Sequence, residues 1–161
     1  MSKIEINNVY KIFGPKPSSV LKMVQDGATK EDVLEQTGHT VGLDNVSLKI
    51  EEGETFVCMG LSGSGKSTLL NCIGLLDKFV SGKFKILNKE YSLLTESEIT
   101  NIRLNDIGFV FQNHRLFPEF SALENIIIPS LIKNIPFDEA NTDYQERYYC
   151  LSPKKEKVSF H

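Results

Sequence analysis

The chain has 161 residues, of which 40% are hydrophobic and 24% charged, and its formal net charge is −3. This size and composition are typical of one globular domain with a core of its own. The acidic balance argues against a nucleic-acid partner, and no apolar run approaches the roughly 20 residues that cross a bilayer. The amino terminus has no apolar signal core, so we expect a cytoplasmic protein.

The cysteine content excludes two kinds of small, cross-linked domain. There are three cysteines, Cys58, Cys72 and Cys150, which are widely spaced and form no C-x-x-C pair. Neither a disulfide framework nor a zinc site is therefore predicted.

The first element expected is a strand over residues 3–14, where apolar and polar residues alternate. Phe13 stands at its end, before a Gly-Pro turn. Its ring is placed where the chain leaves the sheet and could stack on a flat base. A core aromatic at a strand end is an equally good interpretation of the sequence.

Residues 15–41 predict an inserted helical hairpin. Ser18 or Ser19 can cap its first helix, and Thr29 with Asp32 resembles a cap for the second. The insertion carries no catalytic pattern, so it is either a surface for a partner or a solvated decoration.

Residues 60–68, Gly-Leu-Ser-Gly-Ser-Gly-Lys-Ser-Thr, fit the pattern G-x-x-x-x-G-K-[ST] of a phosphate-binding loop. Glycine lets the backbone N–H groups wrap a polyphosphate closely, and Gly60, Gly63 and Gly65 provide that freedom. We also place Ser62 and Ser64 among the nucleotide-binding residues.

The end of this loop supplies charge and a metal ligand. Lys66 would reach the β- and γ-phosphates, Ser67 would give its hydroxyl to Mg²⁺, and Thr68 would begin a helix whose positive end faces the anion. The apolar run 54–59 predicts a buried strand before the loop, and residues 68–76 have helical spacing after it. The predicted ligand is a nucleoside triphosphate with magnesium.

Residues 83–87 alternate again and predict a small antiparallel sheet beside a parallel core. Residues 95–104 predict a short helix, and the continuous apolar run 107–111 predicts a strand buried on both faces. Gln112 follows at the carboxyl end of that strand, where ligands sit in open α/β sheets. It could join a magnesium or water shell, or simply end the strand.

Ser121 and Glu124 form a capping box that opens a helical segment, which Pro129 should interrupt. Residues 141–161 show no clean period, and we expect a loosely ordered tail.

Together, Phe13, residues 60–68, residues 109–112 and residues 123–125 resemble the nucleotide-binding subunit of ABC transporters. The resemblance covers about residues 3–140, so we expect a nucleotide-binding domain over 1–140. It implies an α/β fold: a P-loop NTPase core of parallel strands, a small antiparallel β subdomain and the start of a helical subdomain.

The resemblance also implies roles and partners. Phe13 matches the aromatic that stacks on adenine, and Gln112 matches the glutamine that touches Mg²⁺ and faces the membrane subunit. The implied cofactors are ATP and Mg²⁺. The implied partners are a transmembrane permease subunit and a second ATP-binding subunit, at the inner face of the cell membrane.

Two subfamilies are represented. Residues 1–68 look most like the ATP-binding subunit of glycine betaine/proline importers, whereas residues 69–135 are similar to subunits of lipoprotein-releasing and macrolide-export systems. The glycine betaine/proline type is our first expectation for the transported solute, and the second type is the alternative.

The sequence has no recognisable LSGGQ-type signature, no strand ending in the catalytic Asp-Glu pair and no switch histidine, and we expect the C-terminal half of the domain to be absent. Phe137-Asp-Glu139 is a lookalike that we reject, because Asn134 and Pro136 spoil the strand before it. We therefore expect little ATP hydrolysis by the chain alone. A non-catalytic nucleotide-binding module and a fragment without independent function are the alternatives.

Overall fold

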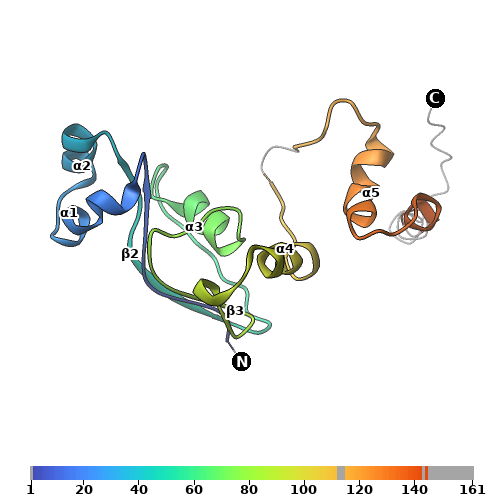
Figure 1. The fold of residues 1–161 in the computed structure, drawn as a ribbon, viewed down its shortest axis with the longest axis horizontal. Helices are drawn as coiled ribbons and strands as arrows, with labels where there is room; N and C mark the ends of the chain where they lie inside the picture. The colour runs from blue at the N-terminus through green and yellow to red at the C-terminus, as the bar shows by residue number, and fades with distance from the viewer. Residues whose placement is uncertain (1, 112–114, 143, 145–161) are drawn as a thin grey trace. The chain divides into compact units, whose positions relative to one another are not determined.

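The computed structural model describes residues 2–111, 115–142 and 144 (Figure 1). The chain divides into two compact units, Met1–Ile107 and Gly108–His161, and each is described by itself. Among the described residues, no helix combines the length and the apolar character that a membrane span requires.

The first unit is built on a four-stranded antiparallel sheet with strand order β2-β1-β3-β4. The strands are β1 (Ser2–Phe13), β2 (Thr40–Glu51), β3 (Ser81–Ile86) and the two-residue β4 (Lys89–Glu90). β1 pairs with both β2 and β3. The predicted antiparallel sheet is thus confirmed, and β1 lies at its centre.

An irregularity in β1 explains why its apolar pattern skips a position. Ile6 and Val9 are three residues apart, yet both are fully buried in one cluster. The pairing register of β1 shifts between them, and Asn8 has a φ of 49°. Such a bulge changes the side of the sheet that following residues face, so the strand keeps its apolar side toward the core.

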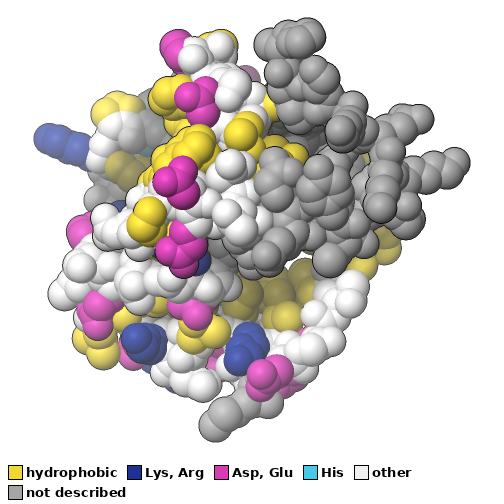
Figure 2. All heavy atoms as spheres, turned by 90° about the vertical axis from the view of Figure 1, so that its right-hand side faces the viewer, with side chains coloured by type: hydrophobic (Ala, Val, Ile, Leu, Met, Phe, Trp, Pro, Cys, Tyr) yellow, Lys and Arg dark blue, Asp and Glu magenta, His cyan; other side chains and the backbone are white. Residues whose placement is uncertain are grey.

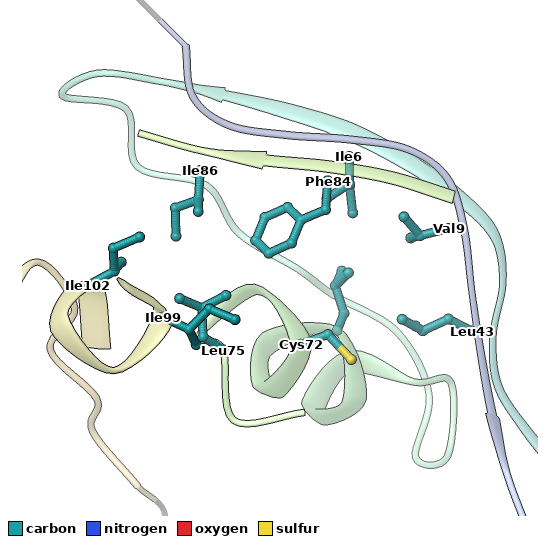
Figure 3. Close-up of a cluster of buried hydrophobic side chains, with 10 residues drawn as sticks. Ile6, Val9, Leu43, Cys72, Leu75, Phe84, Ile86, Ile99 and Ile102 are labelled. Carbon is teal, nitrogen blue, oxygen red and sulfur yellow. The ribbon is translucent and has the colours of Figure 1, made fainter. Parts of the chain in front are cut away.

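Two helices cover one face of this sheet, α3 (Lys66–Ile73) and α4 (Glu96–Asn105), with a short 3₁₀ turn, η2 (Tyr91–Leu93), before α4. Their apolar side chains meet those of the strands in one core, as Figure 3 shows. The buried members are Ile6, Val9, Leu43, Leu69, Cys72, Leu75, Phe84, Ile86, Ile99 and Ile102. The core therefore holds the helix that follows the glycine-rich loop against β1 and β2.

The predicted helical insertion is present as η1 (Pro17–Val20), α1 (Leu21–Gln25) and α2 (Lys30–Thr37). Thr29 and Asp32 form the expected capping box of α2. The predicted cap at Ser18 or Ser19 is wrong, because the first turn is 3₁₀ and its N-cap residue, Lys16, makes no side-chain cap. A second apolar cluster packs the insertion against β1 and β2, and its buried members are Tyr10, Ile12, Val20, Val24, Val33 and Val41.

Two predicted parallel strands are not formed. Residues 54–59 and 107–111 have no strand assignment, and Val57, Met59 and Val110 are exposed. A parallel strand needs paired neighbours and helices on both faces. No described strand pairs with either run, so their apolar side chains are left without the burial that their sequence favours.

The second unit contains α5 (Ala122–Ile132), which opens with the predicted capping box of Ser121 and Glu124. The predicted interruption at Pro129 is wrong, because α5 continues through this residue. The side chain of Asn125 holds the preceding loop, since its amide donates to the carbonyl oxygens of Phe117, Phe120 and Ser121 at 3.0–3.1 Å. Figure 2 shows hydrophobic, acidic and basic side chains intermixed on the face that it draws.

Residues 137–142 are helical, so Asp138 and Glu139 do not follow a strand. Their rejection as the catalytic pair agrees with this placement. Gln112 and most of the predicted tail, including Cys150 and His161, lie outside the described residues.

Candidate functional site

The glycine-rich loop enters α3 through a left-handed backbone. Gly63 has a φ of 78°, and Gly65, the N-cap residue of α3, has a φ of 96°. Residues other than glycine adopt these φ values only at a cost in free energy. α3 begins at Lys66, two residues before the predicted start at Thr68. The free N–H groups of the first helical turn therefore lie within the glycine-rich motif, and helix ends of this kind can bind anions.

Backbone-to-backbone contact fixes the loop against β2. A Cβ atom added to Gly65 would lie 2.4 Å from the carbonyl oxygen of Gly42 and 3.2 Å from Cδ2 of Leu43. At Gly60, an added Cβ would lie 2.7 Å from Oγ of Ser64. Glycine is thus required at Gly65 for close approach as well as for its conformation.

Lys66 turns its ammonium back over the loop. Its Nζ donates hydrogen bonds to the carbonyl oxygens of Gly60 at 2.8 Å and Leu61 at 2.7 Å, and contacts Oγ of Ser64 at 3.4 Å. Lys66 is partly exposed to solvent. The positive charge therefore lies over the loop, within reach of an anion bound by the backbone N–H groups.

A pocket of about 220 Å³ joins the loop to the sheet. Its lining residues are Phe13, Thr40, Val41, Gly42, Gly63, Gly65, Lys66, Ser67 and Thr68. Ligand pockets commonly measure roughly 300–1,000 Å³, so this one fits part of a nucleotide rather than all of it. It brings together most of the predicted site residues, while Gly60, Ser62 and Ser64 are not among those that line it.

Phe13, the last residue of β1, lies in this pocket with its ring exposed. In the sequence, Phe13 precedes the lining residues of β2 and α3 by 27 to 55 positions. The antiparallel pairing of β1 with β2 brings it beside them. The structure thus places an aromatic ring next to the glycine-rich loop.

Gly42 is a site residue that the sequence interpretation missed. An added Cβ would lie 2.7 Å from Cε2 of Phe13 and 3.1 Å from Cγ2 of Thr68. A glycine inside a strand often marks a close approach of another group, which is the signal that could have identified it. Gly42 therefore gives the Phe13 ring its room beside α3.

The side chains at this site could bind magnesium only if phosphate oxygens supply further ligands. Among residues 2–111, 115–142 and 144, no cluster of three or more His, Cys, Asp or Glu side chains could hold a metal. The Ser67 hydroxyl lines the pocket beside Lys66. Mg²⁺ typically keeps several waters and takes one or two protein ligands together with substrate phosphates, so this sparse protein set fits it.

The thiol of Cys72 is poorly reactive. Cys72 is buried in α3, and burial, followed by the negative charge of Asp77, raises the pKa of its thiol to about 11. Because the thiolate is the reactive form, this cysteine has a packing role.

The sequence is similar to those of known ATP-binding proteins. The chain is 43% identical over 126 residues to the glycine betaine/carnitine transport ATP-binding protein GbuA of Listeria monocytogenes, covering 78% of this chain and 32% of the relative. It is 41% identical over 114 residues to the lipoprotein-releasing system ATP-binding protein LolD of Pseudoalteromonas translucida, covering 71% of this chain and 45% of the relative. The expected resemblance to both subfamilies is thus confirmed, but each match is longer than the segment, 1–68 or 69–135, to which the sequence assigned it.

A solved structure also matches. The ATP-binding cassette MJ0796, a dimer bound to ADP and Pi, superposes with a TM-score of 0.68 and 36% identity, covering 89% of this chain and 54% of that one. The present chain spans about a third of the length of the glycine betaine relatives, which include the ProV protein of Escherichia coli. Because the sequence profile of the ABC transporter family matches residues 43–159, the chain belongs to the ABC transporter family.

Proposed function

We propose that this chain binds Mg-ATP and is the ATP-binding part of a transporter for a betaine-type solute. One observation carries the proposal: a single pocket combines the Phe13 ring, the N-terminal turn of α3 and the glycine-rich loop. An aromatic face beside an anion-binding helix end matches a nucleotide, which has a flat base at one end and phosphates at the other.

Each part of the pocket has a role in this proposal. The N–H groups of the first turn of α3 bind the phosphates, and Lys66 exchanges its bonds to Gly60 and Leu61 for bonds to phosphate oxygens. Ser67, which lines the pocket, would hold Mg²⁺ together with the phosphates, and the ion would supply positive charge beside them. Phe13 stacks on the base. Gln112 remains a second proposed magnesium contact, outside the described residues.

The solute and partners are inferred from relatives. The glycine betaine/carnitine and glycine betaine/proline betaine proteins are relatives at 42–43% identity, which favours a betaine-type solute. The lipoprotein-releasing relative keeps lipoprotein export as the alternative. In either system we propose a permease subunit and a second ATP-binding subunit as partners, at the inner face of the membrane. Binding of the purified chain to the permease subunit of a glycine betaine importer, but not to that of a lipoprotein-releasing system, would distinguish the two alternatives.

Equilibrium titration of the purified chain with Mg-ATP tests the binding proposal. Lys66→Ala removes the ammonium, and charged hydrogen bonds of about 1.5–3 kcal/mol predict a loss of affinity of roughly 10- to 150-fold. Lys22→Ala is the matched control, because Lys22 is an exposed lysine of α1 outside the pocket. Unchanged affinity in Lys66→Ala, or equal losses in both variants, would contradict the proposal.

The same preparation tests the non-catalytic alternative. Phosphoryl transfer needs a positioned water and charge stabilisation on the far side of the γ-phosphate, and the sequence carries no recognisable signature or catalytic pair. We expect binding without turnover. Magnesium-dependent hydrolysis above the level of Lys66→Ala would show that these groups are supplied by residues not identified above.

A further inference from the structure

Lys11 of β1 is a buried lysine, with 9% of its surface exposed. Lysine is rarely buried, because removing an ammonium from water costs free energy unless the charge is paired. Its Nζ forms an ion pair with the carboxylate of Asp77 and donates a hydrogen bond of 2.9 Å to the carbonyl oxygen of Lys78. Asp77 is itself held by the backbone N–H of Lys78 at 2.7 Å. The ammonium is thus fixed in position.

The fixed ammonium lies 4.9 Å from the centroid of the Phe13 ring. A cation within about 6 Å of an aromatic face is attracted by the negative π surface. Phe13 lines the pocket, whereas Lys11 is not among the lining residues. Lys11 therefore contacts the aromatic side chain of the pocket without itself being a wall of the pocket.

We propose that Lys11 is the positioning residue for the Phe13 ring in base binding. This inference rests on the proposed function, because it requires that Phe13 stacks on a base. The cation holds one orientation of an otherwise exposed ring, so less conformational freedom is lost on stacking. It also draws ring electron density toward itself, which weakens the repulsion between the ring and the electron-rich face of a purine. Asp77 contributes indirectly, because its ion pair holds the Lys11 ammonium in place.

A purely structural role for Lys11 makes a different prediction. The ion pair with Asp77 joins β1 to the chain that follows α3, and the backbone bond from Val80 N to Tyr10 O, at 2.8 Å, joins the same two segments. If Lys11 only holds these segments together, its loss weakens binding of every phosphate ligand alike. If it positions Phe13, its loss weakens only the part of binding that depends on the base.

The test compares Mg-ATP with inorganic tripolyphosphate, which has the phosphates but no base, on the full 161-residue chain. Lys11→Met keeps an unbranched side chain that is one atom shorter and removes its charge. We expect its affinity for Mg-ATP to fall about fivefold and its affinity for tripolyphosphate to change by less than about twofold. Lys11→Arg, which keeps a cation, should restore the ratio of the two affinities.

A double-mutant cycle makes the assignment specific. With Phe13→Ala already present, Lys11→Met should leave the ratio of the two affinities unchanged, because the ring that it positions is gone. Equal losses for both ligands, or a further change in the Phe13→Ala background, would overturn the proposal.

If Lys11→Met shows no cooperative melt, Asp77→Asn takes its place. We expect Asp77→Asn to lose ATP affinity selectively, by a smaller factor than Lys11→Met. An equal loss of affinity for both ligands would contradict the proposal. A native chain that binds neither ligand would contradict the proposed function itself.

Discussion

Gly65 and Gly42 meet backbone to backbone, since a Cβ atom on Gly65 would lie 2.4 Å from the Gly42 carbonyl oxygen. Gly65 also has a φ of 96°. Gly65→Ala therefore has two costs. Alanine in a left-handed conformation costs roughly 1–2 kcal/mol, and its Cβ atom would clash with the backbone of Gly42, which has no alternative rotamer. We expect a free-energy loss of more than about 2 kcal/mol in urea unfolding.

Gly53→Ala separates these two penalties. Gly53 has a φ of 76°, but an added Cβ would meet no atom within 4 Å. It should show the conformational cost alone. Equal losses of stability in the two variants would mean that the contact with Gly42 contributes nothing.

Gly42→Ala tests the room that this residue gives to Phe13. An added methyl group, 2.7 Å from the Phe13 ring, must displace the ring or the strand. Stacking on a base contributes about 1–3 kcal/mol, so ATP affinity should fall by up to that amount while tripolyphosphate affinity falls less. Gly108→Ala is the control, because an added Cβ there meets no atom within 4 Å and φ is not in the left-handed region. Undiminished ATP binding in Gly42→Ala would refute this packing argument.

The capping boxes predict a loss of stability in acid. Hydrogen bonds from the backbone N–H of Thr95, and then from its hydroxyl, hold the pKa of Glu98 below the ordinary value of 4.5. A depressed pKa in the folded state adds stability that is present above the ordinary value and is lost as the pH falls through the folded pKa. Urea unfolding should therefore show lower stability below about pH 4.5 than at pH 6.

Glu98→Gln should make this dependence shallower, because a glutamine keeps the capping geometry without a titrating group. A variant with the same acid dependence as the native chain would show that Glu98 is not a source of it.

The rate at which Cys72 is alkylated tests whether α3 is packed as described. Because burial raises the pKa of Cys72 to about 11, alkylation at pH 8 should leave this thiol unmodified in the folded chain and modify it in urea. Peptide mass spectrometry measures the extent at each cysteine. Rapid modification of Cys72 under native conditions would show that α3 is not packed as described.

The local elements followed from the sequence because their causes are local. The capping boxes at Thr29 and Ser121 each depend on residues three positions apart, and the glycine-rich loop carries its conformation in its own residues. The strands at 54–59 and 107–111 were wrongly predicted, because a buried parallel strand depends on neighbours that no short run of residues specifies. Gly42 and Lys11 were missed for a related reason, since each acts on Phe13 through a contact that only the folded chain creates.

The central claim is that the first unit folds around a nucleotide-binding pocket. The most direct test is the thermal melt of the chain with and without Mg-ATP, beside the melt of Lys66→Ala. A ligand that binds only the native state must stabilise it, by about 2.7 kcal/mol at a concentration 100 times its Kd. We predict a cooperative melt that Mg-ATP shifts upward in the native chain and shifts much less in Lys66→Ala. A melting temperature that Mg-ATP leaves unchanged in the native chain would contradict the claim.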